Sequence, residues 1–108
     1  MSFKFVLSTC PDLASAHTLA EGLLEQDLAA CINLIPNVVS LYKWQGKIEQ
    51  SAEVQLFIKT DERNWPELQS FIVQNHPYDV PEVIALDLTD GNPSYLSWLT
   101  ENLKKENS

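Results

Sequence analysis

The sequence has few basic residues, and that shortage excludes one class of partners. Only 7 lysine and arginine residues stand against 15 aspartate and glutamate residues, so the formal charge of the 108 residues is −8. No cluster of basic residues occurs along the chain. Proteins that bind nucleic acid or an anionic membrane surface gather lysine and arginine on one face. We therefore expect neither a nucleic-acid partner nor a membrane partner.

Long hydrophobic runs are absent as well. No apolar stretch approaches the roughly 18 residues of a membrane span. The first residues, Met-Ser-Phe-Lys-Phe-Val-Leu, lack the basic segment and long apolar run of a signal peptide. With only two cysteines, Cys10 and Cys31, the sequence predicts a cytoplasmic protein whose thiols are both reduced.

Catalytic and metal-binding motifs are scarce. The three glycines form no phosphate-binding loop, and the sequence contains no nucleophile elbow, no Cys-x-x-Cys and no His-x-x-x-His. Cys10 and His76 are the one conceivable pair of nucleophile and base, and no sequence feature brings them together. We therefore expect a protein that is not an enzyme, and the residues alone give a weak metal signal.

What is present is one long β-hairpin, from Cys31 to Thr60. The returning arm alternates between apolar and polar residues, which is typical of a strand with one buried and one wetter face. Gln45-Gly46 is the expected turn, because glycine tolerates the positive φ of a tight hairpin. Pro36-Asn37 interrupts the outgoing arm and predicts a bulge or an edge.

The length of this hairpin predicts self-association. An arm of about 13 residues spans about 40 Å, whereas a compact 100-residue domain has a radius of gyration of about 13 Å. The tip around Tyr42, Trp44 and Ile48 should therefore extend beyond its own core, and an apolar ribbon of this kind needs cover. A second copy of the chain is the favoured cover; the alternative is a hairpin that curls back over its own helices.

The other segments complete an alternating order of elements. We expect a strand at Phe3–Thr9, a helix at about Leu13–Gln26 capped by Asp12, a second helix opened by an Asn64/Glu67 capping box and ended before Pro77, a strand at Val83–Leu88, and a short helix after Asn92-Pro93. This order predicts one α+β domain over residues 1–108. Its fold class is a ferredoxin-like βαββαβ sandwich with an extra C-terminal helix.

Several segments closely resemble the CutA family, which is named for divalent-cation tolerance. The matching stretches are Thr9-Cys10-Pro11, residues 29–36 (AACINLIP), residues 42–49 (YKWQGKIE), Ile58-Lys59-Thr60, residues 76–82 (HPYDVPE) and residues 91–98 (GNPSYLSW). They cover nearly the whole chain in order. Asn37 stands where members often have glycine, and Asp79 replaces the usual glutamate.

The resemblance implies a tight homotrimer in which the long hairpins pair with neighbouring subunits. It also implies an architecture similar to that of trimeric nitrogen-signalling regulators, which bind small ligands in clefts between subunits. The family is associated with tolerance to copper and other divalent cations, and copper binding has been attributed to its members. The expected function is thus a non-enzymatic, trimeric metal-binding protein with copper or another divalent cation as its cofactor.

Three residues are candidate metal ligands. Cys10 precedes a helix N-terminus, where the helix dipole favours thiolate, and the alternative is a small packed residue at a turn. Cys31 opens a strand and resembles a core cysteine, although the two sulfurs together would suit Cu(I) if they lay close. His76 follows a helix end, where it could be a ligand or a C-terminal cap.

A second set of residues suggests a ligand cleft. Lys59, Tyr78 and Glu82 could hold an anionic or zwitterionic molecule between subunits, or Lys59 and Glu82 could form an ordinary ion pair there. The alternative function is therefore a signalling module that binds a small metabolite or a partner protein in this cleft. Tyr42, Trp44 and Ile48 at the hairpin tip are expected to anchor the trimer interface.

Overall fold

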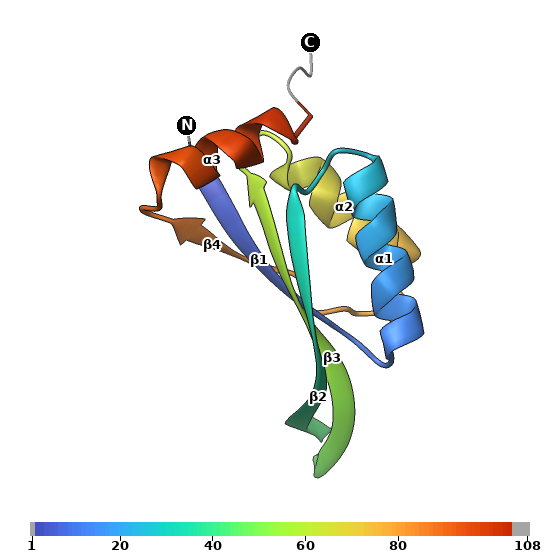
Figure 1. Ribbon diagram of the computed structural model, residues 1–108. Helices are drawn as coiled ribbons and strands as arrows, with labels where there is room; N and C mark the ends of the chain where they lie inside the picture. Colours follow the sequence, from blue (N-terminus) through green and yellow to red (C-terminus); the bar gives the residue numbers. More distant parts are fainter. Residues whose placement is uncertain (1, 105–108) are drawn as a thin grey trace.

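The computed structural model describes residues 2–104 and has the α+β architecture that the sequence predicts (Figure 1). Its elements are β1 (Phe3–Cys10), α1 (Leu13–Glu25), β2 (Cys31–Trp44), β3 (Lys47–Asp61), α2 (Trp65–Asn75), β4 (Ile84–Leu88) and α3 (Pro93–Glu101). Every expected strand and helix is present, with ends that differ from the predicted ones by a residue or two.

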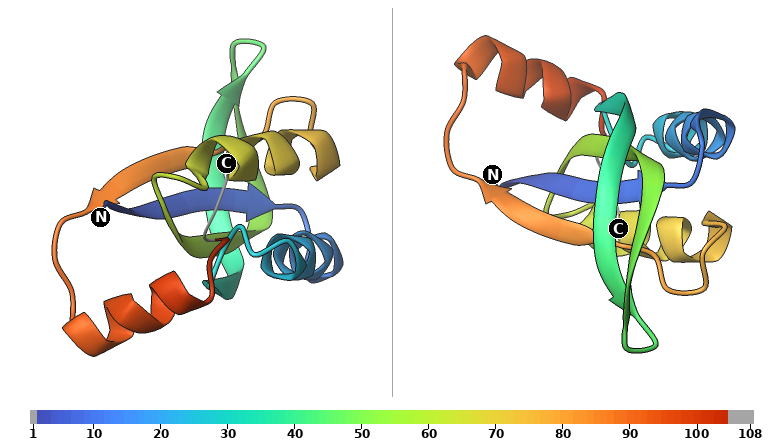
Figure 2. Two further views of the ribbon diagram at one scale, coloured as in Figure 1. Left: turned by 90° about the horizontal axis from the view of Figure 1, so that it is seen from above. Right: turned by 90° about the horizontal axis from the view of Figure 1, so that it is seen from below.

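The four strands form one antiparallel sheet in the order β2-β3-β1-β4. Helices α1 and α2 lie side by side against one face, and α3 lies apart from them (Figures 1 and 2). Alternate residues of β1 and β3, such as Val6 and Ile58, point into this layer because side chains alternate along a strand. They pack with Leu23 of α1 and with Leu68 and Ile72 of α2 to form the core.

The β2–β3 hairpin projects well beyond the helical layer (Figure 1). The molecule measures 44 × 26 × 23 Å, so the hairpin makes it elongated. The predicted turn is confirmed, since Gln45 and Gly46 both have positive φ, of 52° and 78°. The predicted bulge is confirmed too, because the β2–β3 register shifts between Ile35 and Val38. The hairpin points away from α1 and α2, so the alternative of a hairpin folded over its own helices is wrong.

The two predicted helix caps have different outcomes. Asp12 caps α1 as expected, with its carboxylate accepting the backbone N–H of Ser15 at 2.7 Å. The capping box predicted for α2 is wrong: Asn64 precedes α2, but its side chain makes no cap hydrogen bond. Instead the buried Asn64 amide donates to Asp61 at 2.8 Å and to the Lys104 carbonyl at 3.2 Å. Tertiary hydrogen bonds therefore replace the local cap at this helix.

Helix α3 and the residues after it are fastened to the rest of the subunit. Leu99 and Leu103 are buried. The backbone N–H of Lys104 donates to the Asp27 carbonyl at 2.7 Å, in the turn between α1 and β2. Within residues 2–104 no helix is long and apolar enough to cross a membrane.

A candidate metal site at the end of strand β1

Cys10 is the last residue of β1 and is fully buried next to the start of α1. Burial raises the pKa of its thiol above the usual value, because a thiolate loses solvation in this position, and a hydrogen bond with Ser15 offsets only part of that effect. The expectation that the helix N-terminus favours thiolate is therefore wrong for this subunit. Desolvation and the nearby carboxylates of Asp12 and Glu53 outweigh the Ser15 hydrogen bond, so the raised pKa favours the neutral thiol.

The structure brings His76 to Cys10 across 66 residues of sequence. The Cys10 Sγ and His76 Nε2 atoms lie 3.7 Å apart, and both side chains are buried. His76 follows α2 directly and points back to the end of β1. No local sequence signal predicts this meeting, because it depends on how the segment after α2 packs against the sheet.

Hydrogen bonds fix the protonation of the His76 ring. Its Nδ1 atom accepts the backbone N–H of Tyr78 at 3.0 Å, so Nδ1 carries no proton. Its Nε2 atom lies 2.7 Å from the Thr9 carbonyl oxygen, which can only accept, so Nε2 donates there. The imidazole is thus neutral, with its proton on the nitrogen that faces Cys10 and Thr9. His76 also packs against the Tyr78 ring, with a centroid distance of 4.9 Å.

This arrangement opposes both a nucleophile–base pair and a metal ligand unless the ring proton moves from Nε2 to Nδ1. A general base needs a free lone pair on Nε2, and that atom already bears a proton. Moving the proton to Nδ1 sacrifices the hydrogen bonds to Thr9 and Tyr78, at a cost of roughly 1–3 kcal/mol each. Metal binding has to supply this free energy, and two donors supply less than the four ligands of a structural zinc site.

The separation of the two donor atoms fits one shared metal ion. Metal–sulfur and metal–nitrogen bonds of about 2.3 and 2.1 Å at a tetrahedral centre place the two donors roughly 3.6 Å apart. The observed separation of Cys10 Sγ and His76 Nε2 is 3.7 Å. Within residues 2–104, no group of three or more His, Cys, Asp or Glu side chains is arranged to hold a metal. One subunit therefore brings one sulfur and one imidazole nitrogen together without a third such side chain beside them in the described residues.

Cys31 belongs to a different part of the fold. It opens β2 opposite Lys59 of β3, whereas Cys10 pairs with Val54 of β3 from the other side. Their partners on β3, Val54 and Lys59, are five residues apart, and the two cysteines lie on strands on opposite sides of β3. Their backbone positions are therefore about 19 Å apart. Within one subunit they cannot share a metal. Cys31 instead lies 3.8 Å from the Lys59 ammonium and close to the Tyr95 hydroxyl.

A cleft of about 850 Å³ lies between the hairpin and the segment that follows α2. We call it the hairpin cleft. Its lining residues are Ser40, Leu41, Tyr42, Trp44, Glu49, Glu53, Pro77, Tyr78, Asp79, Val80 and Glu82. It contains the predicted ligand residues Tyr78 and Glu82 but not Lys59. Lys59 lies about 20 Å along β3 from the cleft residue Glu53 and donates a hydrogen bond to Asn33. Within one subunit the predicted Lys59–Glu82 pair does not form.

The structure divides the three predicted interface residues between two faces of the hairpin. Tyr42 pairs with Glu49 and Trp44 with Lys47, so these four side chains share the face that borders the cleft. Ile48 pairs with Lys43 on the opposite face. Sequence alternation already implies this division, since neighbouring strand residues point to opposite sides.

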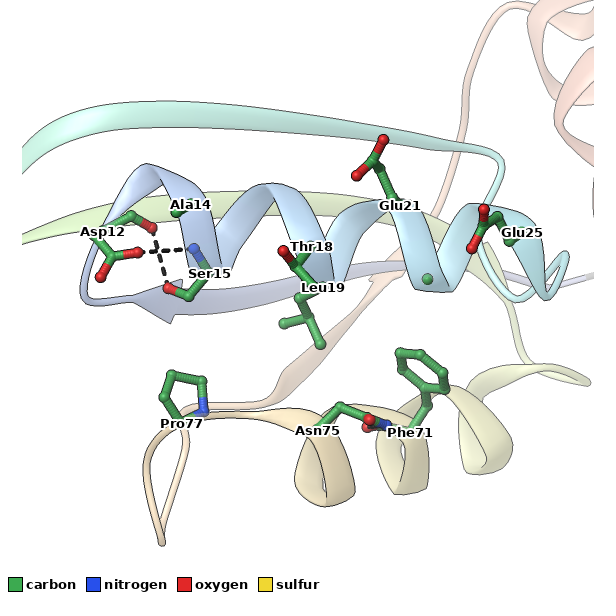
Figure 3. Close-up of a pocket in the computed structure, with 11 residues that line it drawn as sticks. Asp12, Ala14, Ser15, Thr18, Leu19, Glu21, Glu25, Phe71, Asn75 and Pro77 are labelled. Carbon is green, nitrogen blue, oxygen red and sulfur yellow. Dashed lines mark hydrogen bonds between the residues drawn. The ribbon is translucent and has the colours of Figure 1, made fainter.

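A groove of about 720 Å³ separates α1 from α2 on the helical layer (Figure 3). The ring of Phe71 on α2 packs against the backbone of Gly22 on α1. A Cβ atom added at Gly22 would lie only 2.7 Å from this ring, so the contact requires glycine. The groove contains Asp12 and Ser15, which form the α1 cap (Figure 3). None of the predicted site residues lines it, so the Cys10–His76 pair and the hairpin cleft are the relevant features.

Comparison with known proteins gives one consistent family. Residues 4–102 match the family described as CutA1 divalent ion tolerance protein. The divalent-cation tolerance protein CutA of Pectobacterium atrosepticum is 46% identical over 99 residues, which are 92% of this chain and 90% of that protein. CutA1 from Oryza sativa superposes with a TM-score of 0.95 at 39% identity, covering 98% of this chain and 97% of the other.

A third relative bears on location. It is described as the periplasmic divalent cation tolerance protein CutA from Archaeoglobus fulgidus, and it superposes with a TM-score of 0.91 at 32% identity over 94% of this chain and 99% of its own. The expectation of a cytoplasmic protein therefore stays a prediction. With a family match over almost its whole length, close relatives and the same fold, the chain belongs to the CutA1 divalent ion tolerance family.

Proposed function

We propose that this protein contributes to divalent-cation tolerance by binding a metal ion, without catalysis, at Cys10 and His76. The observation that carries the proposal is the 3.7 Å separation of Cys10 Sγ and His76 Nε2 in a buried position. One thiolate and one imidazole form a donor set that suits copper, and Cu(I) in particular because it prefers soft ligands. Binding through Nε2 requires its proton to move to Nδ1, with loss of the hydrogen bonds to Thr9 and Tyr78, so the bound metal must compensate for both.

We further propose that the working unit is a homotrimer with the ferredoxin-like subunit expected from the sequence. Self-association is supported by exposed apolar residues on the hairpin face that carries Ile48. Ile48 is 73% exposed and Val39 is 60% exposed in the isolated subunit. Ile84 and Leu86 on β4 are also about half exposed, at 47% and 48%. Apolar surface on this scale is typical of a surface covered by another subunit.

A titration of Cu(I) into the reduced protein under anaerobic conditions tests the metal proposal. We expect a saturable site that Cys10→Ser weakens by at least about tenfold, since serine replaces the soft sulfur with a hard oxygen. Cys31→Ser is the matched control, because Cys31 lies about 19 Å from Cys10 and should not contribute. Affinity that is unchanged in Cys10→Ser, or lost in Cys31→Ser, contradicts the assignment.

The affinity should also rise with pH. Burial raises the pKa of the Cys10 thiol, so the protein binds the metal only after this proton leaves. Below the raised pKa, each pH unit upward should therefore tighten binding by about tenfold for the one proton released. Competition with a copper chelator, corrected for the chelator's own protonation, measures this slope between pH 6.5 and 8.5. A flat profile would show that the Cys10 thiol does not bind the metal.

A further inference from the structure

The hairpin cleft has aromatic walls from two distant parts of the chain. Tyr42 and Trp44 lie on the cleft-facing side of the hairpin, and Tyr78 comes from the segment after α2. The Tyr78 hydroxyl donates to Glu53 Oε2 at 2.8 Å, which ties that segment to β3. Desolvation, together with this hydrogen bond, raises the pKa of Tyr78, so its hydroxyl remains a donor. The cleft is thus built by specific contacts.

All the charged side chains that line the cleft are acidic. Glu49 and Glu53 come from β3, and Asp79 and Glu82 come from the segment after α2. No lysine or arginine is among the lining residues. The cleft therefore carries a formal charge of −4, and an anionic ligand would meet like charges on both walls. The expected cleft between subunits, with Lys59 holding an anionic or zwitterionic molecule, stays a prediction, because a single subunit does not contain it.

The spacing of these carboxylates does not suit a bare metal ion. Ca²⁺ and Mg²⁺ need several oxygen ligands that converge at about 2.0–2.6 Å. No three acidic, histidine or cysteine side chains within residues 2–104 are grouped in this way. The four carboxylates share the lining of a space of about 850 Å³ with the aromatic residues Tyr42, Trp44 and Tyr78. A larger cation with an apolar body matches this arrangement better.

We propose that the hairpin cleft binds a small organic cation, an alkylammonium or alkylguanidinium compound. The rings of Tyr42, Trp44 and Tyr78 attract the cation through their π faces, which contributes about 0.5–2 kcal/mol per contact according to its desolvation. Glu53 and Glu82 supply the opposite charge. This cleft adjoins the proposed metal site through Tyr78, which packs against His76, but neither Cys10 nor His76 lines it.

The test is a titration of n-butylammonium chloride into the full chain in the presence of EDTA. Binding is followed by NMR through the indole N–H of Trp44, assigned with the Trp44→Leu variant. n-Butanol and sodium butyrate serve as probes of the same length with neutral and negative head groups. We expect saturable shifts with butylammonium, binding at least about tenfold weaker for the other two, and weaker butylammonium binding at high salt.

Two variants and a control locate the effect. Glu53→Gln and Tyr42→Leu should each weaken butylammonium binding, still followed through the Trp44 indole N–H, by about fivefold or more. Glu67→Gln removes one exposed carboxylate outside the cleft and should leave binding unchanged. Equal binding of all three probes, no saturation, or an equal loss in Glu67→Gln would overturn the proposal. Because no metal is present, failure here leaves the Cys10–His76 proposal standing.

A lysine of a second copy is the competing occupant. Lys43 and Lys47 are exposed at the hairpin tip and could enter the cleft of a neighbouring subunit. In that case butylammonium would bind only after both lysines are changed to alanine, and the parent protein would show no shift. That outcome overturns the proposal of a free small ligand. Saturable binding to the parent protein supports it.

Discussion

Replacing Val39 and Ile48 together by aspartate should convert the assembled protein into separate subunits. Both side chains lie on the hairpin face opposite Tyr42 and Trp44, and both are mostly exposed in the isolated subunit. Burying two aliphatic side chains stabilises an interface by about 3 kcal/mol or more per subunit. Their loss, together with two buried charges, should raise the dissociation constant by more than about 100-fold. Light scattering over a range of concentrations measures the mass.

A matched control uses exposed apolar residues of the helical layer. Leu24 is 40% exposed on α1 and Val73 is 51% exposed on α2. Aspartate at both of these positions makes the same chemical change on a surface that the proposed interface does not use. The mass should then remain that of the parent protein. Equal dissociation in both double variants, or none in either, would show that the hairpin does not hold the subunits together.

Changing Asp61 to alanine should destabilise the fold by about 3–5 kcal/mol. The Asp61 carboxylate is fully buried at the end of β3. It accepts from the Asn64 backbone N–H at 3.1 Å, from the Asn64 amide at 2.8 Å and from Arg63 Nη2 at 3.0 Å. Alanine leaves the buried Asn64 donors without this acceptor and weakens the start of α2. Urea unfolding at a fixed protein concentration measures the loss.

Asp61→Asn separates the role of charge from the role of shape. Asparagine keeps one acceptor oxygen for Asn64 but loses the charge that faces Arg63. It should therefore cost clearly less than alanine. If both variants unfold at the same urea concentration as the parent protein, the Asp61 network does not stabilise the fold.

The hairpin could be predicted from sequence because its signals are local. Alternation along β3, the Gln45-Gly46 turn and the Pro36-Asn37 bulge each depend on a few neighbouring residues, and the structure confirms all three. Asn37 has a φ of 64°, a left-handed conformation that asparagine tolerates better than most residues. The length of the two strands alone predicts that the hairpin extends beyond the core.

The candidate metal site could be predicted only in part because its signals are not local. Cys10 and His76 were both identified, but their meeting depends on the packing of the segment after α2 against β1. The pKa direction of Cys10 was wrong because burial, which the sequence does not report, disfavours the thiolate. Asn64 shows the same limit, since its side chain serves tertiary partners in place of the helix cap.

X-ray absorption at the copper edge of the Cu(I)-loaded Cys31→Ser variant tests the central claim most directly. In this variant Cys10 supplies the one remaining cysteine sulfur. The proposed site predicts a copper shell with one sulfur and at least one imidazole nitrogen, and the His76→Ala change should remove that nitrogen while the sulfur stays. A shell of nitrogen and oxygen alone would contradict a metal site at Cys10 and His76.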